Sequence, residues 1–167
     1  FMAGARAEQN AEDWWSSLVT ATQICLKEAN ISGDAVDAMA YATTCCTVVA
    51  LDKNGAPLLP ALMWMDVRAD KEAEAVLETG DQRLILNGNG QGPVSAEWMI
   101  PKALWLKRNE PKIFDDAVTI CEYQDYLTMR LTGERCASLN NVGLRWHYAN
   151  RDGGWASGIV EKLGMPD

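Results

Sequence analysis

The apolar and polar positions of residues 10–29 follow the pattern of an amphipathic helix. Trp14, Leu18 and Leu26 recur with other apolar residues at spacings of three and four, and the charged residues lie mostly between them. Asn10 precedes this stretch, and its side chain suits a helix N-cap. The pattern therefore predicts a helix over residues 10–29.

The period of the apolar positions changes after this helix. Residues 36–42, 47–51 and 58–64 are short, apolar and rich in branched or aromatic side chains, which is typical of strands. Between the last two lie Asn54 and Gly55, a dipeptide favoured in the turns of antiparallel hairpins. We therefore expect three strands, of which the last two form a hairpin.

Helical spacing returns in the remainder of the chain. The pattern predicts helices over residues 69–79, 95–109, 125–131 and 155–163, and a short strand over 118–121. Pro101 lies inside the second of these helices and predicts a kink or a second helix start. The predicted fold class is α/β, with a mixed sheet and flanking helices but without the regular strand–helix alternation of a doubly wound nucleotide fold.

Charge and composition narrow the choice of partners. The 167 residues contain 15 Lys and Arg against 23 Asp and Glu, a formal net charge of −8. Nucleic acids are recognised by clustered basic residues, and the basic residues here are scattered. No apolar run approaches the length of about 20 residues that crosses a bilayer. We therefore expect neither a nucleic-acid nor a membrane partner.

The cysteines indicate the compartment. Five cysteines, at positions 25, 45, 46, 121 and 136, form neither an even-numbered disulfide framework nor the paired spacings of a zinc site. They are expected to be reduced, mostly buried thiols. The first residues lack the apolar core of a signal peptide, so a cytoplasmic protein is expected. His147 is the only histidine and is expected to be structural.

Familiar catalytic motifs are absent from the sequence. Residues 88–92 are rich in glycine, but the third glycine is misplaced for a dinucleotide fingerprint and Pro93 follows. This segment is expected to be a flexible loop. Neither a phosphate-binding GxxxxGK[ST] loop nor a GxSxG elbow occurs, and the many carboxylates mark no catalytic pair.

Polar and aromatic residues interrupt the predicted strands at two places. Residues 41–47 (YATTCCT) put small hydrogen-bonding side chains where strand packing favours Val or Ile. Residues 63–68 (MWMDVR) place an aromatic ring, Trp64, beside the acid Asp66 and the base Arg68. Sugars bind to such combinations of an aromatic face with fixed donors and acceptors. The alternative is a core tryptophan with an Asp66–Arg68 surface pair.

Four segments, in chain order, resemble the FGGY family of carbohydrate kinases. Residues 7–15 resemble the family's AEQ…DWW helix entry, and residues 47–69 resemble TVVxxDxxGxPL…WxDxRA. Residues 97–106 (EWMIPKALWL) are similar to the EWMLPKLLWL helix of ribulokinase-like members. Residues 125–134 (DYLTMRLTGE) are similar to DYLTYRLTGE. The resemblance implies a partial actin-like, ribonuclease-H-like lobe, and a kinase that uses ATP and Mg²⁺ to phosphorylate a sugar or polyol hydroxyl.

The resemblance also implies which residues meet the sugar. Trp64 matches the tryptophan that packs on the carbon skeleton of the substrate. Thr44 and Cys45 fall where relatives place Arg-Glu for glycerol or Met-His for xylulose, and they should face the sugar. Lys102 matches a lysine near the sugar in ribulokinases, where a cation can hold a hydroxyl.

Two carboxylates complete the expected substrate-binding set. Glu97 falls near a tyrosine that contacts glycerol in glycerol kinases. Asp66 is adjacent to Trp64, although pairing with Arg68 to fix the loop is an equal alternative.

The departures from the family pattern bear on substrate and extent. Because both Arg-Glu and Met-His are missing at positions 44 and 45, the resemblance favours a ribulokinase-like pentulose kinase. A glycerol, polyol or xylulose kinase and a non-catalytic sugar-binding module stay open.

The resemblance also sets an expectation for the extent of the chain. The family's Asp-x-Gly-Thr hairpin and its glycine-rich segment with the base aspartate find no match. Residues 1–167 are therefore expected to be an internal part of the N-terminal, sugar-binding domain, without a catalytic residue, a metal ligand or the C-terminal ATP-binding domain. Members of the family are often homodimers.

Overall fold

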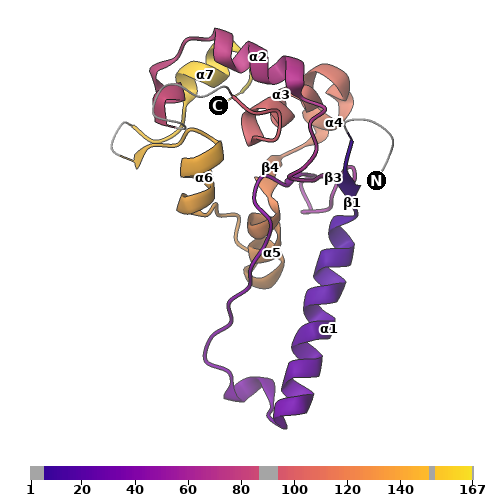
Figure 1. The fold of residues 1–167 in the computed structure, drawn as a ribbon. Helices are drawn as coiled ribbons and strands as arrows, with labels where there is room; N and C mark the ends of the chain where they lie inside the picture. The colour runs from indigo at the N-terminus through magenta and orange to yellow at the C-terminus, as the bar shows by residue number, and fades with distance from the viewer. Residues whose placement is uncertain (1–5, 87–93, 151–152, 167) are drawn as a thin grey trace.

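The computed structural model describes residues 6–86, 94–150 and 153–166 (Figure 1). Its elements, in chain order, are β1 (Glu8–Gln9), α1 (Ala11–Ala29), η1 (Gly33–Ala35), β2 (Val48–Leu51), β3 (Ala61–Leu62), α2 (Asp70–Glu78), η2 (Gln82–Leu86), α3 (Met99–Asn109), α4 (Pro111–Asp116), β4 (Thr119–Glu122), α5 (Tyr123–Thr132), α6 (Leu139–Arg145) and α7 (Ser157–Lys162). The expected α/β class with flanking helices is confirmed.

A four-stranded sheet with the order β1-β3-β2-β4 forms the centre of the described chain. Each pairing within the described residues is antiparallel, whereas the sequence predicted a mixed sheet. The hairpin between β2 and β3 is confirmed. Its turn is held by the Asp52 carboxylate, which accepts hydrogen bonds from the backbone N–H groups of Asn54 (2.8 Å) and Ala56 (2.9 Å).

Helices cover both faces of β2. Because side chains alternate along a strand, Val49 and Leu51 point to one face and Val48 and Ala50 to the other. The first pair packs in a cluster with Trp14 of α1 and with Tyr126 and Leu127 of α5. The second pair packs in a cluster with Met99, Trp105 and Leu106 of α3. All four residues of β2 are buried, which explains their continuous apolar run.

The helix α1 matches its prediction closely. It spans 19 residues, and the side chain of Asn10 caps it by accepting from the backbone N–H of Glu12 at 3.1 Å. Figure 1 shows α1 extending away from the body of the molecule, with the chain after it returning towards the sheet. The N-terminal part, with Trp14, is the part packed on the sheet.

The predicted strand over residues 36–42 is wrong. The segment has no strand pairing in the described chain and is almost wholly exposed, with Val36 at 43% and Met39 at 46%. Strand stability comes from a paired neighbour and a covered face, and this segment has neither. Its apolar composition is therefore not enough to form a strand here.

Further differences concern the helices. The sequence missed α4 and α6, which are six and seven residues long and too short to show a clear period. The helix predicted over 95–109 begins at Met99, so Pro101 lies in the first turn and marks a helix start. The predicted loop at residues 88–92 lies outside the described residues.

The cysteines are all free, as expected, but they are not mostly buried. Cys25 and Cys136 are exposed, Cys45 is half-buried, and only Cys46 and Cys121 are buried. Within the described residues, no helix is both long and apolar enough to cross a membrane.

The turn glycine offers a stability test. Gly55 and Gly133 have almost the same left-handed φ, 79° and 78°, but a Cβ on Gly55 would lie 2.9 Å from the Met129 methyl carbon, whereas Gly133 faces open space. We expect Gly133→Ala to cost about 1 kcal/mol for the backbone and Gly55→Ala about 1 kcal/mol more for the displaced methionine. Urea denaturation of both variants measures this difference, and equal losses would contradict it.

Candidate functional site

The segment 44–47 forms a turn that leads into β2. Thr44 is exposed, Cys45 is half-buried, and Cys46 and Thr47 are buried. Cys46 adopts a left-handed backbone conformation with φ 73°, which a strand does not allow. The small polar residues thus belong to a turn just before the first residue of the central strand β2 rather than to a strand.

Thr47 joins this turn to the second candidate segment. Its hydroxyl oxygen accepts a hydrogen bond from the backbone N–H of Trp64 at 3.1 Å and lies 3.3 Å from the Thr44 hydroxyl. Trp64 itself is 40% exposed, which is unusual for a tryptophan side chain. The structure therefore brings Thr44 and Trp64 to one end of the β2–β3 hairpin, with an indole surface left open.

Lys102 of α3 holds the turn at Cys46 and the segment at Met63 together from the interior of the protein. It is fully buried, and its ammonium group donates to the backbone carbonyls of Cys46 (2.7 Å) and Met63 (2.6 Å). Burial lowers the pKa of Lys102 to about 8, because the charged form loses hydration. In this geometry Lys102 positions the two turns, and its ammonium group does not reach the surface.

Glu97 lies half-buried just before α3. Its backbone N–H donates to the Ser95 hydroxyl at 3.2 Å. The carboxylate is close enough to Lys102 for its charge to raise the pKa of that lysine, against the larger effect of burial. Glu97 thus lies within electrostatic range of the lysine that holds the two turns.

Asp66 is fully buried and completely engaged. It accepts hydrogen bonds from the backbone N–H of Ala7 (2.6 Å) and from Arg68 at the backbone N–H (3.1 Å), Nε (2.8 Å) and Nη2 (2.7 Å). Burial would raise the pKa of Asp66, but the bonds from Arg68 and Ala7 outweigh it and hold the pKa below its usual value. The Asp66–Arg68 pair exists, as the alternative prediction had it, but it is buried rather than on the surface.

Arg68 extends this network. Its Nη2 also donates to Glu8 at 2.6 Å, and its guanidinium lies 4.9 Å from the centre of the Trp105 ring. The network thereby ties β1 to the segment after β3 and to α3.

The sequence analysis did not single out Glu122, a buried carboxylate that bonds to the turn at Cys46. It is fully buried at the junction of β4 and α5, where it caps the helix in a reciprocal box with Asp125. Its Oε2 accepts the backbone N–H of Cys46 at 3.1 Å. Burial raises the pKa of Glu122 to about 8. An acid three residues before a second acid at a helix start is a capping signal, but its tertiary partner leaves no trace in the sequence.

Arg145 is a second residue that the sequence did not single out. Its guanidinium lies 5.3 Å from the centre of the Trp98 ring and helps to lower the pKa of the Cys46 thiol. The Trp98 ring also contacts His147 in a T-shaped arrangement, with ring centres 5.6 Å apart. Because burial lowers the pKa of His147, the ring is neutral and packs as a core residue, in line with its expected structural role.

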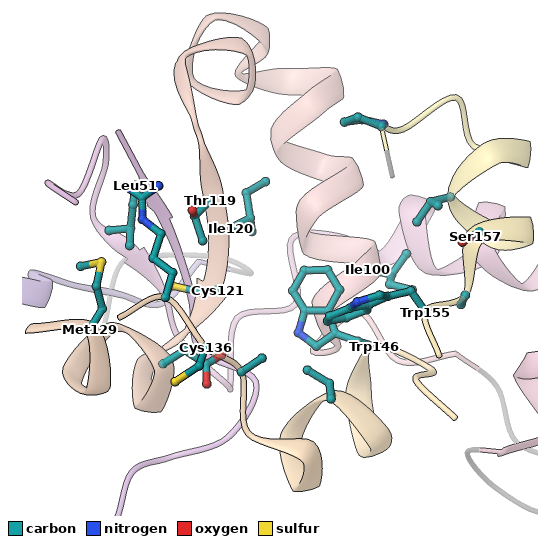
Figure 2. A pocket seen from close by; sticks show the side chains of 17 residues that line it. Leu51, Ile100, Thr119, Ile120, Cys121, Met129, Cys136, Trp146, Trp155 and Ser157 are labelled. Carbon is teal, nitrogen blue, oxygen red and sulfur yellow. The ribbon is translucent and has the colours of Figure 1, made fainter. Parts of the chain in front are cut away.

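A cavity of about 520 Å³ lies elsewhere, along the outer edge of β4 (Figure 2). Its walls are mostly apolar side chains, among them Leu51, Ile100, Trp146 and Trp155, and none of the six predicted substrate residues lines it. Figure 2 shows the two indoles side by side near Ile100, and their ring centres are 6.3 Å apart. A sugar needs partners for its hydroxyls, so the polar turn cluster suits it better than this cavity.

The described residues contain no group of three or more His, Cys, Asp or Glu side chains that could hold a metal ion.

Comparison with known proteins gives the family. The N-terminal-domain model of the FGGY family of carbohydrate kinases matches residues 2–167. Xylulose kinase of Bacillus subtilis is 26% identical over 95% of this chain and 32% of its own length. Ribulokinase 1 of Staphylococcus saprophyticus is 30% identical over 87% of this chain and 29% of its own length.

The fold comparison agrees. The crystal structure of "a xyloylose kinase" from Brucella ovis superposes with a TM-score of 0.85 at 23% identity, over 99% of this chain and 34% of that one. The chain thus spans about a third of the length of such relatives. Because the family model matches almost the whole chain, the chain belongs to the FGGY family of carbohydrate kinases and matches the N-terminal domain of that family.

Proposed function

We propose that this chain is the sugar-binding part of an ATP-dependent kinase that phosphorylates a hydroxyl of a pentulose. The observation that carries the proposal is the arrangement of Thr44, Cys45 and Trp64 at one end of the β2–β3 hairpin, supported from below by Lys102. ATP and Mg²⁺ belong to the proposal for the whole protein.

The chemistry of this surface supports a carbohydrate ligand. The open face of Trp64 can cover the C–H side of a sugar ring or chain. The Thr44 hydroxyl is exposed, and the Glu97 carboxylate is half-buried nearby, so both can bond to sugar hydroxyls. Asp66 and Lys102 are buried and fully occupied with the protein, and we assign them the task of holding the two turns in place.

The names of two relatives bear on the substrate. The Staphylococcus relative is a ribulokinase and the Bacillus relative a xylulose kinase, and both names denote five-carbon ketoses. We favour the ribulokinase-like reading because Thr44 and Cys45 replace the Met-His pair expected of xylulose kinases. Xylulose is the second candidate, supported by the several relatives named xylulose kinase.

We further propose that the chain is an internal part of the N-terminal domain of a longer enzyme. The exposed apolar segment 36–42 supports this, because an unpaired stretch with Val36 and Met39 open to water is stabilised when another strand covers it. In this view the base and the ATP site come from other parts of the enzyme, and these residues alone do not phosphorylate a sugar. Sugar-dependent ATP turnover by residues 1–167 alone would contradict it.

A pair of tryptophan variants tests where the sugar binds. In the full-length enzyme, Trp64→Ala is expected to raise the pentulose KM about tenfold, the equivalent of about 1.4 kcal/mol of lost stacking. Trp155→Ala is the matched control, because Trp155 is also exposed (52%) but lines the apolar cavity. Steady-state kinetics with ribulose, xylulose, ribitol and glycerol give the comparison. A KM that changes only in the Trp155 variant would move the sugar to the cavity and overturn the assignment.

A further inference from the structure

Two cysteines stand next to each other in the turn before β2. The sulfur atoms of Cys45 and Cys46 are 3.8 Å apart, and both thiols are free. Cys46 is 6% exposed and Cys45 is half-buried, so the pair is reached from solvent through Cys45. Among the described cysteines, no other sulfur–sulfur contact occurs.

The backbone at this point is strained. Cys46 has φ 73°, a conformation in which glycine is free but a residue with a Cβ loses about 1–2 kcal/mol. Strain of this kind gathers at functional positions, where the side chain has a use. The left-handed turn also places the Cys46 sulfur against that of its neighbour.

The surroundings divide the roles of the two thiols. The hydrogen bond from Cys45 lowers the pKa of Cys46, and a hydrogen bond from Arg145 adds to this effect. The same contact, together with burial, raises the pKa of the Cys45 thiol. Because the pKa of Cys46 is lowered and that of Cys45 is raised, we assign the attacking role to Cys46 and the role of the protonated neighbour to Cys45.

We propose that Cys45 and Cys46 form a reversible oxidation site, in which a peroxide converts the two thiols into a vicinal disulfide. The Cys46 thiolate attacks one peroxide oxygen and the O–O bond breaks. The departing hydroxide takes up the proton that the Cys46 thiol had released, so that water and a sulfenic acid form. The Cys45 sulfur then attacks the Cys46 sulfur, the S–O bond breaks, and the second water leaves with the Cys45 proton. Two thiols and one hydrogen peroxide thus give one disulfide and two waters.

The disulfide is expected to be labile. The α-carbons of adjacent residues are about 3.8 Å apart across a trans peptide, whereas disulfides prefer about 4.4–6.8 Å. Strained disulfides of this kind are the readily reduced ones. A small thiol such as dithiothreitol should therefore restore the pair quickly.

Oxidation would also act on the proposed sugar site. The carbonyl of Cys46 accepts from Lys102 and its N–H donates to Glu122, so a new bond at its side chain must shift both contacts. This consequence rests on the proposed function. If it holds, the oxidised full-length enzyme shows a rise in sugar KM of about tenfold, the equivalent of about 1.4 kcal/mol of lost binding energy.

The sequence makes the oxidation easy to detect. Trypsin releases residues 28–53 as one peptide, which contains Cys45 and Cys46 and no other cysteine. The full-length protein is treated with hydrogen peroxide, alkylated with iodoacetamide and digested, with and without dithiothreitol before alkylation. After oxidation we expect peptide 28–53 to carry neither carbamidomethyl label and to weigh two hydrogens less than the same peptide in its reduced, unlabelled form. Dithiothreitol before alkylation should restore both labels. Independent loss of single labels, or a link between peptides 113–130 and 136–145 in its place, would overturn the proposal.

Serine variants give the controls. Cys45→Ser and Cys46→Ser should each abolish the two-hydrogen loss, and the first keeps the test valid should the second fail to fold. Cys136→Ser, at an exposed cysteine, should leave it unchanged. Closure of the disulfide without a change in sugar KM would support the oxidation site and count against the proposed sugar site, so the two failures are distinguishable.

Discussion

Replacing Asp66 with alanine is expected to lower the free energy of unfolding by about 3–5 kcal/mol, the range for a buried ion pair that loses one partner. The substitution removes the acceptor of four hydrogen bonds, three of them from Arg68. Arg68 is left 5% exposed with Glu8 as its remaining carboxylate, and the N–H of Ala7 loses its acceptor. Because this network ties β1 to the turn after Trp64, we also expect the proposed sugar site to loosen.

An exposed aspartate provides the matched control for this prediction. Asp116 pairs with Lys112 at 2.6 Å, close to the 2.7 Å between Asp66 and Arg68, but its side chain is 52% exposed. Asp116→Ala is expected to change stability little, because water replaces the lost partner. Guanidinium denaturation of both variants measures the difference. Equal losses would show that the buried network is not what holds these segments together.

The parts of the fold that the sequence predicted correctly are those determined by local pattern. The regular spacing of apolar residues along α1, the cap at Asn10 and the turn at Gly55 each depend on residues close together in the chain. The segment 36–42 failed for the opposite reason. Its apolar composition resembles that of a strand, but pairing depends on a partner that local pattern cannot supply.

The candidate site shows the same division. Asp66 and Arg68 are two residues apart, so their pairing was an open alternative from the start. Lys102, in contrast, bonds to carbonyls 56 and 39 residues away, and Glu122 bonds to an N–H 76 residues away. Backbone groups carry no sequence signature, so the resemblance could place Lys102 near the sugar but could not reveal what it holds.

The buried side chains of Glu122 and Lys102 are expected to give the free energy of unfolding an unusual dependence on pH. The pKa of Glu122 rises from 4.5 to about 8 on folding, mainly through burial, so the folded chain keeps a proton that the unfolded chain releases. The stabilisation that Glu122 gains from keeping this proton is fully present below pH 4.5 and is lost as the pH rises to 8. The pKa of Lys102 falls from 10.5 to about 8, so its contribution grows as the pH rises from 8 to 10.5. Each slope reaches at most about 1.4 kcal/mol per pH unit.

Isosteric variants separate the two contributions. Glu122→Gln keeps an acceptor for the N–H of Cys46 but cannot ionise, so the decline between pH 4.5 and 8 should disappear while the rise above pH 8 remains. Lys102→Met should remove the rise, and it should also lower stability throughout, because the carbonyls of Cys46 and Met63 lose their donor at about 1–3 kcal/mol each. Urea denaturation at several pH values gives both curves. Two results together would contradict this view: a wild-type stability curve without a minimum near pH 8, and a Glu122→Gln curve that still declines between pH 4.5 and 8. Burial would then not control the protonation of Glu122 and Lys102, and their proposed role in supporting the two turns would be incorrect.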